Sequence, residues 1–315
     1  MANWIARVAS ALGLKQKVKP TSFDQENGKA PFNASGVAEV APGRFVFIDN
    51  NDASAVFEFA LDADGVAGER ISRRPLVGLT DGELRDPEGL TRVAGSGDVV
   101  LIVASSLCVA GGDRPRHVCD GLVRVRYRAH GDLRAEAMPG FRDWLLRNIP
   151  SLDVAGEQEP DAGGLNVEGL AWEPNAQALF FGMRGPAARG IVTVIRVPVD
   201  VGGRRWTVEA LGSPSMLRVR LPRAKAMQGI RDLSYDERTG DLLMLIGRST
   251  SMADEPFQLC RWDGSSDSVH LLDIKFRRSM KPEGVVTFSG GDERRLLIVD
   301  DRGGYAVVGY PKRAQ

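Results

Sequence analysis

The sequence contains few of the residues on which most nucleophile and soft-metal motifs depend. It has three histidines and three cysteines among 315 residues. The cysteines form no CxxC pair, and their odd number suits a reducing compartment such as the cytoplasm. It also lacks a GxSxG, P-loop or HExxH motif and a GxGxxG that opens a helix. These absences argue against the common serine-hydrolase, nucleotide-binding and zinc-peptidase classes.

An excess of charge and a long apolar run are missing as well. Lys plus Arg and Asp plus Glu both number 41, so charge excess cannot hold a nucleic acid. The sequence has no unbroken apolar run that approaches the length of a membrane span, about 20 residues. Residues 1–14, "MANWIARVASALGL", have apolar residues at helical spacing with Arg7 among them. They predict a short amphipathic helix rather than a signal peptide, followed by one domain over 15–315.

One loop gathers residues that bind soft metals. Cys108, His117 and Cys119 lie within twelve residues of one another. No fourth ligand stands at a familiar spacing, so the sequence gives this loop little weight as a metal site.

A short motif recurs along the chain, with a glutamate before a glycine where an apolar strand begins. It reads "DPEGLTR" at 86–92, "NVEGLAW" at 166–172 and "KPEGVVT" at 281–287. Two degenerate copies surround Gly36 and Asp232. Each copy continues as a short strand, a polar turn and a strongly apolar strand, and the turns contain the Asn, Asp and Gly residues typical of hairpins.

The spacing of the copies predicts the architecture. Aligned on Gly36, Gly89, Gly169, Asp232 and Gly284, they are 53, 80, 63 and 52 residues apart. Four short antiparallel strands in about 50 residues is the period of a propeller blade. We therefore expect an all-β fold, a β-propeller of five blades, or six if the longest interval hides another. That interval contains a short helical insertion at 140–166, and a strand within 15–25 is expected to close the ring.

In a propeller the first strand of each blade is innermost, so the motif places its charged residues around one mouth of the central channel. These residues are Glu88, Glu168, Glu283 and either Arg231 or Asp232. The ends of the second strands fall beside them: Asp49 and Asn50, Ser105 and Ser106, Arg184, Arg248, Asp300 and Asp301. The glycine after each glutamate is expected where a Cβ would crowd the neighbouring strand.

The carboxylates of this ring have three alternative interpretations. They can accept backbone N–H groups and latch neighbouring blades together. They can hold a cation, and oxygen ligands alone suit Ca²⁺ or Mg²⁺. Arginines can instead neutralise them without a metal. The candidate metal ligands are Glu88, Glu168, Asp232, Glu283, Asp49 and Asp300.

Several motifs together resemble a known family. These are "LRDPEGLTR", "GGLNVEGLAWEP" with "FFGMRGP", "QGIRDLSYD", and "KPEGVV" with "LIVDDRG", in order over about 84–303. They are similar to the bacterial domain-of-unknown-function 3616 proteins, which implies a β-propeller without an assigned activity. The chain departs from the pattern of this family at 105–106, where Ser-Ser stands in place of a Ser-His-Ser-like turn. More distantly, the strand start is similar to esterase-like phytase and gluconolactonase-type propellers, which implies an axial divalent metal.

Two functions from different classes follow. The first is a divalent-metal-dependent hydrolase of phosphate esters or lactones, with Glu88, Glu168 and Glu283 as ligands or bases. The substrate would be bound by Arg184, Arg231, Arg248 and Ser105. The second is a non-catalytic propeller whose face with the loops at 105–121 and 141–166 binds a small anionic ligand or a protein. A carbohydrate site using Trp144 and Trp172 is a third interpretation.

Overall fold

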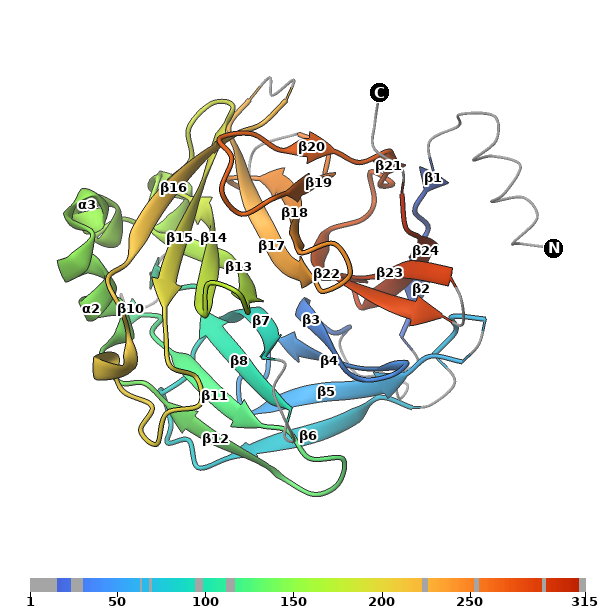
Figure 1. Ribbon diagram of the computed structural model, residues 1–315, viewed down its shortest axis with the longest axis horizontal. Helices are drawn as coiled ribbons and strands as arrows, with labels where there is room; N and C mark the ends of the chain where they lie inside the picture. Colours follow the sequence, from blue (N-terminus) through green and yellow to red (C-terminus); the bar gives the residue numbers. More distant parts are fainter. Residues whose placement is uncertain are drawn as a thin grey trace.

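The chain folds into antiparallel strands that surround a central axis (Figure 1). The computed structural model describes residues 16–23, 31–62, 64–67, 70–93, 99–111, 117–222, 226–251, 255–290 and 293–311. The amphipathic helix expected at 1–14 lies outside these residues. Among the helices that are described, none has both the length and the apolar character needed to cross a bilayer.

Twenty of the 24 strands in the described residues group into five units of four, two of which share one eight-stranded sheet. Unit 1 comprises β3 (Ala34–Ala41), β4 (Arg44–Asp49), β5 (Ala55–Ala60) and β6 (Ser72–Val77). Unit 2 comprises β7 (Pro87–Val93), β8 (Val100–Ser105), β11 (Leu122–Arg126) and β12 (Leu133–Ala137). Unit 3 comprises β13 (Asn166–Glu173), β14 (Ala178–Gly185), β15 (Ile191–Pro198) and β16 (Ser215–Arg220). Unit 4 comprises β17 (Gln228–Asp236), β18 (Asp241–Arg248), β19 (Gln258–Trp262) and β20 (His270–Leu271).

Unit 5 joins the two ends of the chain. It comprises β22 (Pro282–Gly290), β23 (Glu293–Asp300), β24 (Gly304–Gly309) and β2 (Thr21–Ser22). β2 pairs antiparallel with β24, so the expected closing strand within 15–25 is confirmed. Close by, β1 (Gln16–Lys17) pairs parallel with β21 (Ile274–Lys275). The closure leaves the last unit without an unpaired outer edge at β24.

The first strand of every unit is innermost. β3 contacts β7, β7 contacts β13, β13 contacts β17, β17 contacts β22, and β22 returns to β3. The expected inner strands are therefore confirmed, and so is the all-β propeller class. Five buried apolar clusters fill the spaces between neighbouring units, for example Leu90 with Ile48 and Phe181 with Ile102. Because second strands such as β14 are buried on both faces, they read as continuous apolar runs.

The longest interval contains helical turns, as the sequence indicates. α2 (Phe141–Asn148) and α3 (Asp153–Gly156) lie between β12 and β13, with 3₁₀ turns at Pro150–Leu152 and Pro160–Ala162. A further 3₁₀ turn, Val208–Ala210, follows β15. Phe141 and Leu145 are fully buried against the cluster between units 2 and 3, so this segment is packed onto the body of the ring.

Candidate functional site

The starts of the inner strands and the ends of the second strands meet at one mouth of the channel. Pro87 pairs with Ser105, Asn166 with Gly185, Gln228 with Arg248 and Pro282 with Asp300. The predicted site residues of units 2 to 5 therefore lie on one face. We call this face the axial mouth.

A β-bulge interrupts each inner strand at the same place. The unpaired residue is Gly36, Glu88, Glu168, Arg231 or Glu283 in the five successive units. A bulge bends its strand and re-aims the side chain of the extra residue, so one residue per unit is directed differently from its neighbours. Arg231, and not Asp232, is the fourth member. The predicted correspondence between Gly36 and Gly89 is wrong by one residue, because Gly36 occupies the bulge position that Glu88 occupies in unit 2.

The glycine after the bulge allows close approach of neighbouring strands. A Cβ at Gly89 would lie 2.7 Å from Leu170 Cβ, and one at Gly169 would lie 2.9 Å from the backbone nitrogen of Leu233. Both contacts cross from one unit to the next. The expected crowding near the axis is confirmed.

Arg231 lies between two carboxylates. Its Nε donates to Glu283 Oε2 at 2.8 Å, its Nη2 donates to Glu283 Oε1, and its Nη1 lies 2.8 Å from Glu168 Oε2. All three side chains are almost fully buried. Burial lowers the pKa of Arg231, but the charges of Glu168 and Glu283 outweigh it and raise the pKa overall. Burial raises the pKa of Glu283 to about 7, although Arg231 opposes the shift.

Glu168 has a second arginine. Arg184 Nη1, at the end of β14, donates to Glu168 Oε1 at 2.7 Å. Asn166 Nδ2 donates to the same oxygen at 3.4 Å. Two arginines and two of the three glutamates thus form one charge-balanced, buried network at the axial mouth.

Glu88 differs from the other two glutamates because the side chains that donate hydrogen bonds to it, Ser35 and Asn50, are uncharged. Ser35 Oγ donates to its Oε2 at 3.0 Å and Asn50 Nδ2 donates to its Oε1 at 2.8 Å. Burial and the negative charges of Glu168, Asp86 and Glu283 raise its pKa well above the usual range. Its side chain is nonetheless partly exposed. Burial and the neighbouring carboxylates therefore oppose the ionised form of Glu88, and solvent can reach its side chain.

The latch role predicted for a carboxylate belongs to Asp232. Its Oδ2 accepts the backbone N–H of Val285 at 2.7 Å, which joins unit 4 to unit 5. Burial raises its pKa well above the usual range, and the N–H groups of Val285 and Leu233 oppose that shift.

The remaining predicted residues are the last residues of second strands, at the edge of this mouth. Asp49 accepts the N–H groups of Asn33 and Asn51, and Asp300 accepts those of Lys281 and Arg302. Ser105 is fully buried, and its Oγ accepts the N–H of Leu107 at 3.2 Å. Arg248 ends β18 opposite Gln228 and is partly buried.

The six predicted metal ligands do not form a compact oxygen cage. Among the described residues, no three of these carboxylates bring oxygen atoms within 4.8 Å of one another. Glu168 and Glu283 face arginine, and Asp49, Asp232 and Asp300 accept backbone N–H groups. Ca²⁺ takes six to eight oxygen ligands, and these six carboxylates do not gather into such a cluster among the described residues. The residues therefore do not fit a resident Ca²⁺ or Mg²⁺.

Several buried polar atoms at the mouth have no hydrogen-bonding partner among the described residues. They include Asn50 Oδ1, Asn166 Oδ1, Arg184 Nε, and both Oε1 and Nε2 of Gln228. Gln228 is 1% exposed and Asn166 is 5% exposed. Orphaned buried polar atoms are uncommon, and they mark places where a ligand or water completes the structure. Gln228 carries no periodic signal in the sequence, because only its position at a strand start connects it to the site.

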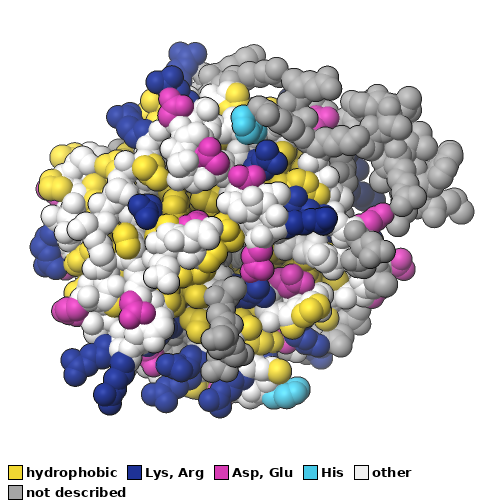
Figure 2. Space-filling model, in the orientation of Figure 1, with side chains coloured by type: hydrophobic (Ala, Val, Ile, Leu, Met, Phe, Trp, Pro, Cys, Tyr) yellow, Lys and Arg dark blue, Asp and Glu magenta, His cyan; other side chains and the backbone are white. Residues whose placement is uncertain are grey.

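The opposite mouth of the channel is hollowed. A cavity of about 610 Å³ is lined there by the later residues of the inner strands, among them Glu39, Arg92, Trp172 and Glu237. Figure 2 shows acidic and basic side chains beside hydrophobic ones over the middle of the ring. Trp172 is thus at the far end of β13 from Glu168, which removes it from the axial mouth.

Comparison with known proteins identifies the family segment. Residues 159–305 match the family described as "Protein of unknown function (DUF3616)". The resemblance is confirmed. The matched segment contains Glu168, Arg184, Arg231 and Glu283, so most of the axial network lies within it. The search of curated proteins gives no match.

Three solved structures are similar to this chain at low identity. The major Malassezia sympodialis allergen Mala s 1 is 10% identical with a TM-score of 0.49, covering 89% of this chain and 93% of its own. An exo-beta-1,3-galactanase from Phanerochaete chrysosporium is 9% identical with a TM-score of 0.48, covering 96% and 67%. A streptogramin B lyase is 11% identical with a TM-score of 0.37, covering 93% and 98%. These likenesses say nothing about activity.

Proposed function

We propose that the axial mouth is a binding site for the cationic end of a polar small molecule. The observation that carries the proposal is the composition of the ring of bulge residues. Arg231 occupies the position between Glu168 and Glu283, whereas Gly36 places no side chain at the position between Glu283 and Glu88. A ligand ammonium or guanidinium would supply there the positive charge that Arg231 supplies on the other side.

The charges and the unpartnered atoms favour a cation over an anion. Arg231 and Arg184 are each paired with a carboxylate, so the positive charge that an anion would need is already balanced. Glu88 and Asn50 Oδ1 are acceptors, and a cation rich in N–H groups would satisfy both. A cation beside Glu88 favours its ionised form, so binding is expected to release a proton.

The test is titration of the protein with primary amines and guanidinium compounds, followed by calorimetry in buffers of different ionisation enthalpy. We expect a binding enthalpy that changes with the buffer, because Glu88 loses its proton, and an affinity that rises with pH. Glu88→Gln should remove binding. Glu39→Gln, on the same sheet at the opposite mouth, is the matched control and should bind as the wild type does. Equal binding by the Glu88→Gln protein would refute the proposal.

One observation also favours a hydrolase. A partly exposed carboxylic acid whose pKa is raised by its surroundings is suited to protonate a leaving oxygen. The corresponding substrates are lactones or phosphate esters, with Glu88 as general acid. Hydrolysis of a lactone and phosphoester panel that Glu88→Gln abolishes and Glu39→Gln preserves would make the protein an enzyme. Turnover retained in Glu88→Gln would remove this candidate.

A further inference from the structure

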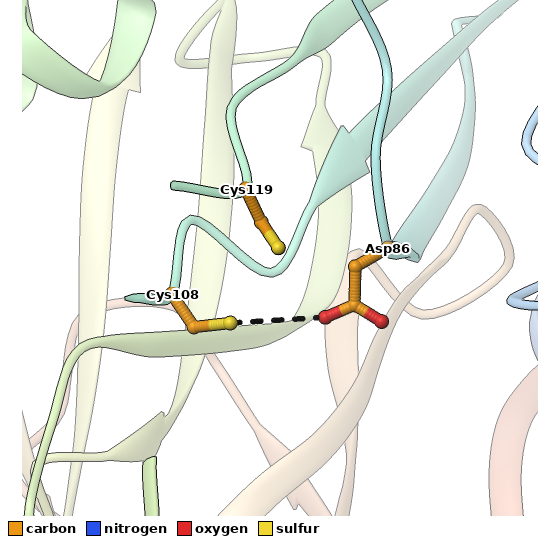
Figure 3. A group of neighbouring side chains, drawn as sticks. All are labelled: Asp86, Cys108 and Cys119. Atoms are coloured by element: carbon orange, nitrogen blue, oxygen red, sulfur yellow. Dashed lines mark hydrogen bonds between the residues drawn. The ribbon is translucent and has the colours of Figure 1, made fainter. Parts of the chain in front are cut away.

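A second cluster of ligand-type side chains lies beside the axial mouth. Asp86, Cys108 and Cys119 direct a carboxylate oxygen and two sulfurs toward one point (Figure 3). The three atoms all lie within 4.8 Å of one another, and Cys108 Sγ is 3.9 Å from Asp86 Oδ2. Cys108 is 4% exposed and Cys119 is 2% exposed. His117, which the sequence grouped with the cysteines, is replaced in the cluster by Asp86.

The two cysteines are held by a short antiparallel ribbon. β9 (Val109–Ala110) pairs with β10 (His117–Val118), and Val118 lies opposite Val109. Continuing that register places Cys119 opposite Cys108, and Cys119 N–H donates to the carbonyl of Cys108 at 2.9 Å. The ribbon therefore fixes both sulfurs on one side.

The third ligand is positioned by an unusual backbone. Asp86 and Leu107 both have a positive φ, 50° and 57° respectively. Such a conformation is uncommon in residues other than glycine, and it clusters at functional sites. Ser106 N–H donates to the carbonyl of Asp86 at 2.9 Å, which ties the cysteine loop to the start of β7.

The helical segment supports the loop from outside. Arg142 of α2 is 4% exposed, and its Nε donates to the carbonyl of Leu107 at 2.8 Å. Its backbone N–H donates to Asp120 Oδ1 at 3.2 Å. Val167 N–H, beside Glu168, donates to the carbonyl of Ser106 at 2.7 Å. The cluster is thus preformed on several elements and does not depend on one exposed loop.

We propose that Asp86, Cys108 and Cys119 bind a Zn²⁺ ion with an open fourth position. In a tetrahedral site with ordinary Zn–S and Zn–O bonds, sulfur and oxygen ligands stand about 3.6 Å apart and two sulfurs about 3.8 Å apart. The observed spacing needs only a small contraction to reach these values. Two sulfurs and one oxygen favour Zn²⁺ over Ca²⁺ and Mg²⁺, which prefer oxygen alone. Three protein ligands leave the fourth position to water or a ligand.

Binding is an exchange of protons for metal. Each thiol loses its proton to solvent as its sulfur coordinates, and the carboxylate is already ionised or loses its own proton. Titration of the reduced, metal-free protein with Zn²⁺ should therefore release protons and reach one equivalent. Co²⁺ in place of Zn²⁺ should give a thiolate-to-metal charge-transfer band and the strong visible bands of a tetrahedral site.

Four variants separate the cluster from general thiol effects. Cys108→Ser, Cys119→Ser and Asp86→Asn should each weaken Zn²⁺ binding by about 100-fold or more, since even outer-shell changes cost 10–100-fold. Cys260→Ser is the matched control, because Cys260 is a fully buried cysteine on β19 outside the cluster. It should bind one equivalent with unchanged affinity.

Two results would overturn the proposal. The first is a Co²⁺ complex of the wild type without a charge-transfer band, which decides the matter even if the cysteine variants do not fold. The second is intact protein that is two mass units lighter and that binds no Zn²⁺ after reduction, because the cysteines would then serve as a cross-strand disulfide.

Discussion

Arg231 and Glu168 occupy the same bulge position in successive units, and their side chains meet with Nη1 2.8 Å from Oε2. They are 63 residues apart in the chain. A position that carries a glutamate in three units thus carries its counter-charge in a fourth. The pair joins units 3 and 4 by charge in addition to strand packing, and removal of Arg231 leaves the buried Glu283 without its two guanidinium donors.

Replacement of Arg231 is expected to destabilise the fold strongly. Arg231→Met keeps much of the apolar stem but leaves Glu168 with Arg184 alone and removes both guanidinium donors from Glu283. Breaking a buried pair from one side costs about 3–5 kcal/mol, and urea denaturation measures the loss. Arg220→Met is the control, because Arg220 and Asp267 are 75% and 70% exposed. That change should cost less than about 1 kcal/mol.

Glu168 and Glu88 are expected to respond oppositely to replacement by glutamine. Glu168→Gln removes the charge that two arginines need, and it should lower the free energy of unfolding by about 1–3 kcal/mol. Glu88→Gln resembles the neutral acid that the surroundings of Glu88 already favour. It should leave stability unchanged or raise it, the usual result where a site sacrifices stability for function. Equal losses in both variants would show that Glu88 is ionised in the folded protein.

The fold could be predicted from the sequence because its signal is repeated. Polar turns and apolar strands recur with the glutamate-glycine motif, and errors in one copy are corrected by the others. The shift at Gly36 escaped that correction because the first copy has no glutamate to align. Only the bulge in β3 shows that Gly36 stands where Glu88 stands in β7.

The site could be predicted in its location but not in its chemistry. Strand order places Glu88, Glu168 and Glu283 at one mouth, and the structure agrees. Whether two charged residues pair depends on the direction of their side chains. A bulge shifts the alternation of side chains by one residue, and the periodicity of the sequence does not reveal that shift. Asp86 is the clearest case. It lies 22 residues before Cys108, and only the turn at its positive φ brings the two together.

Addition of Ca²⁺ or Mg²⁺ provides an independent test of the axial network. Because Arg231 and Arg184 already neutralise Glu168 and Glu283, we expect added Ca²⁺ or Mg²⁺ to leave the melting temperature unchanged. A ligand that binds only the folded state would raise it. The measurement is a thermal scan of chelator-treated protein with each ion, alongside the Arg184→Met variant. A rise in the wild type would restore the metal interpretation, and a rise only in the variant would show that arginine excludes the metal.

The last prediction concerns pH and follows from Glu283. Its pKa is raised from 4.5 to about 7, chiefly by burial. A carboxyl group with a raised folded-state pKa stabilises the fold fully below the unfolded value, and this contribution is lost as pH rises through the folded value. The free energy of unfolding should therefore fall between about pH 5 and pH 8, by up to about 3 kcal/mol from this group. The raised pKa of Glu88 acts in the same direction.

Urea denaturation across this range, for the wild type and Glu283→Gln, isolates the effect. The variant is less stable throughout because Arg231 loses a partner, but its slope with pH should be shallower. Asp52→Asn is the control. Burial raises the pKa of Asp52, but hydrogen bonds from Arg73 and Ser54 outweigh it and lower the pKa overall. Asp52 is thus ionised in both states across the window, and its removal should leave the slope unchanged. An equal slope in the wild type and Glu283→Gln would mean that Arg231 keeps Glu283 ionised at every pH tested.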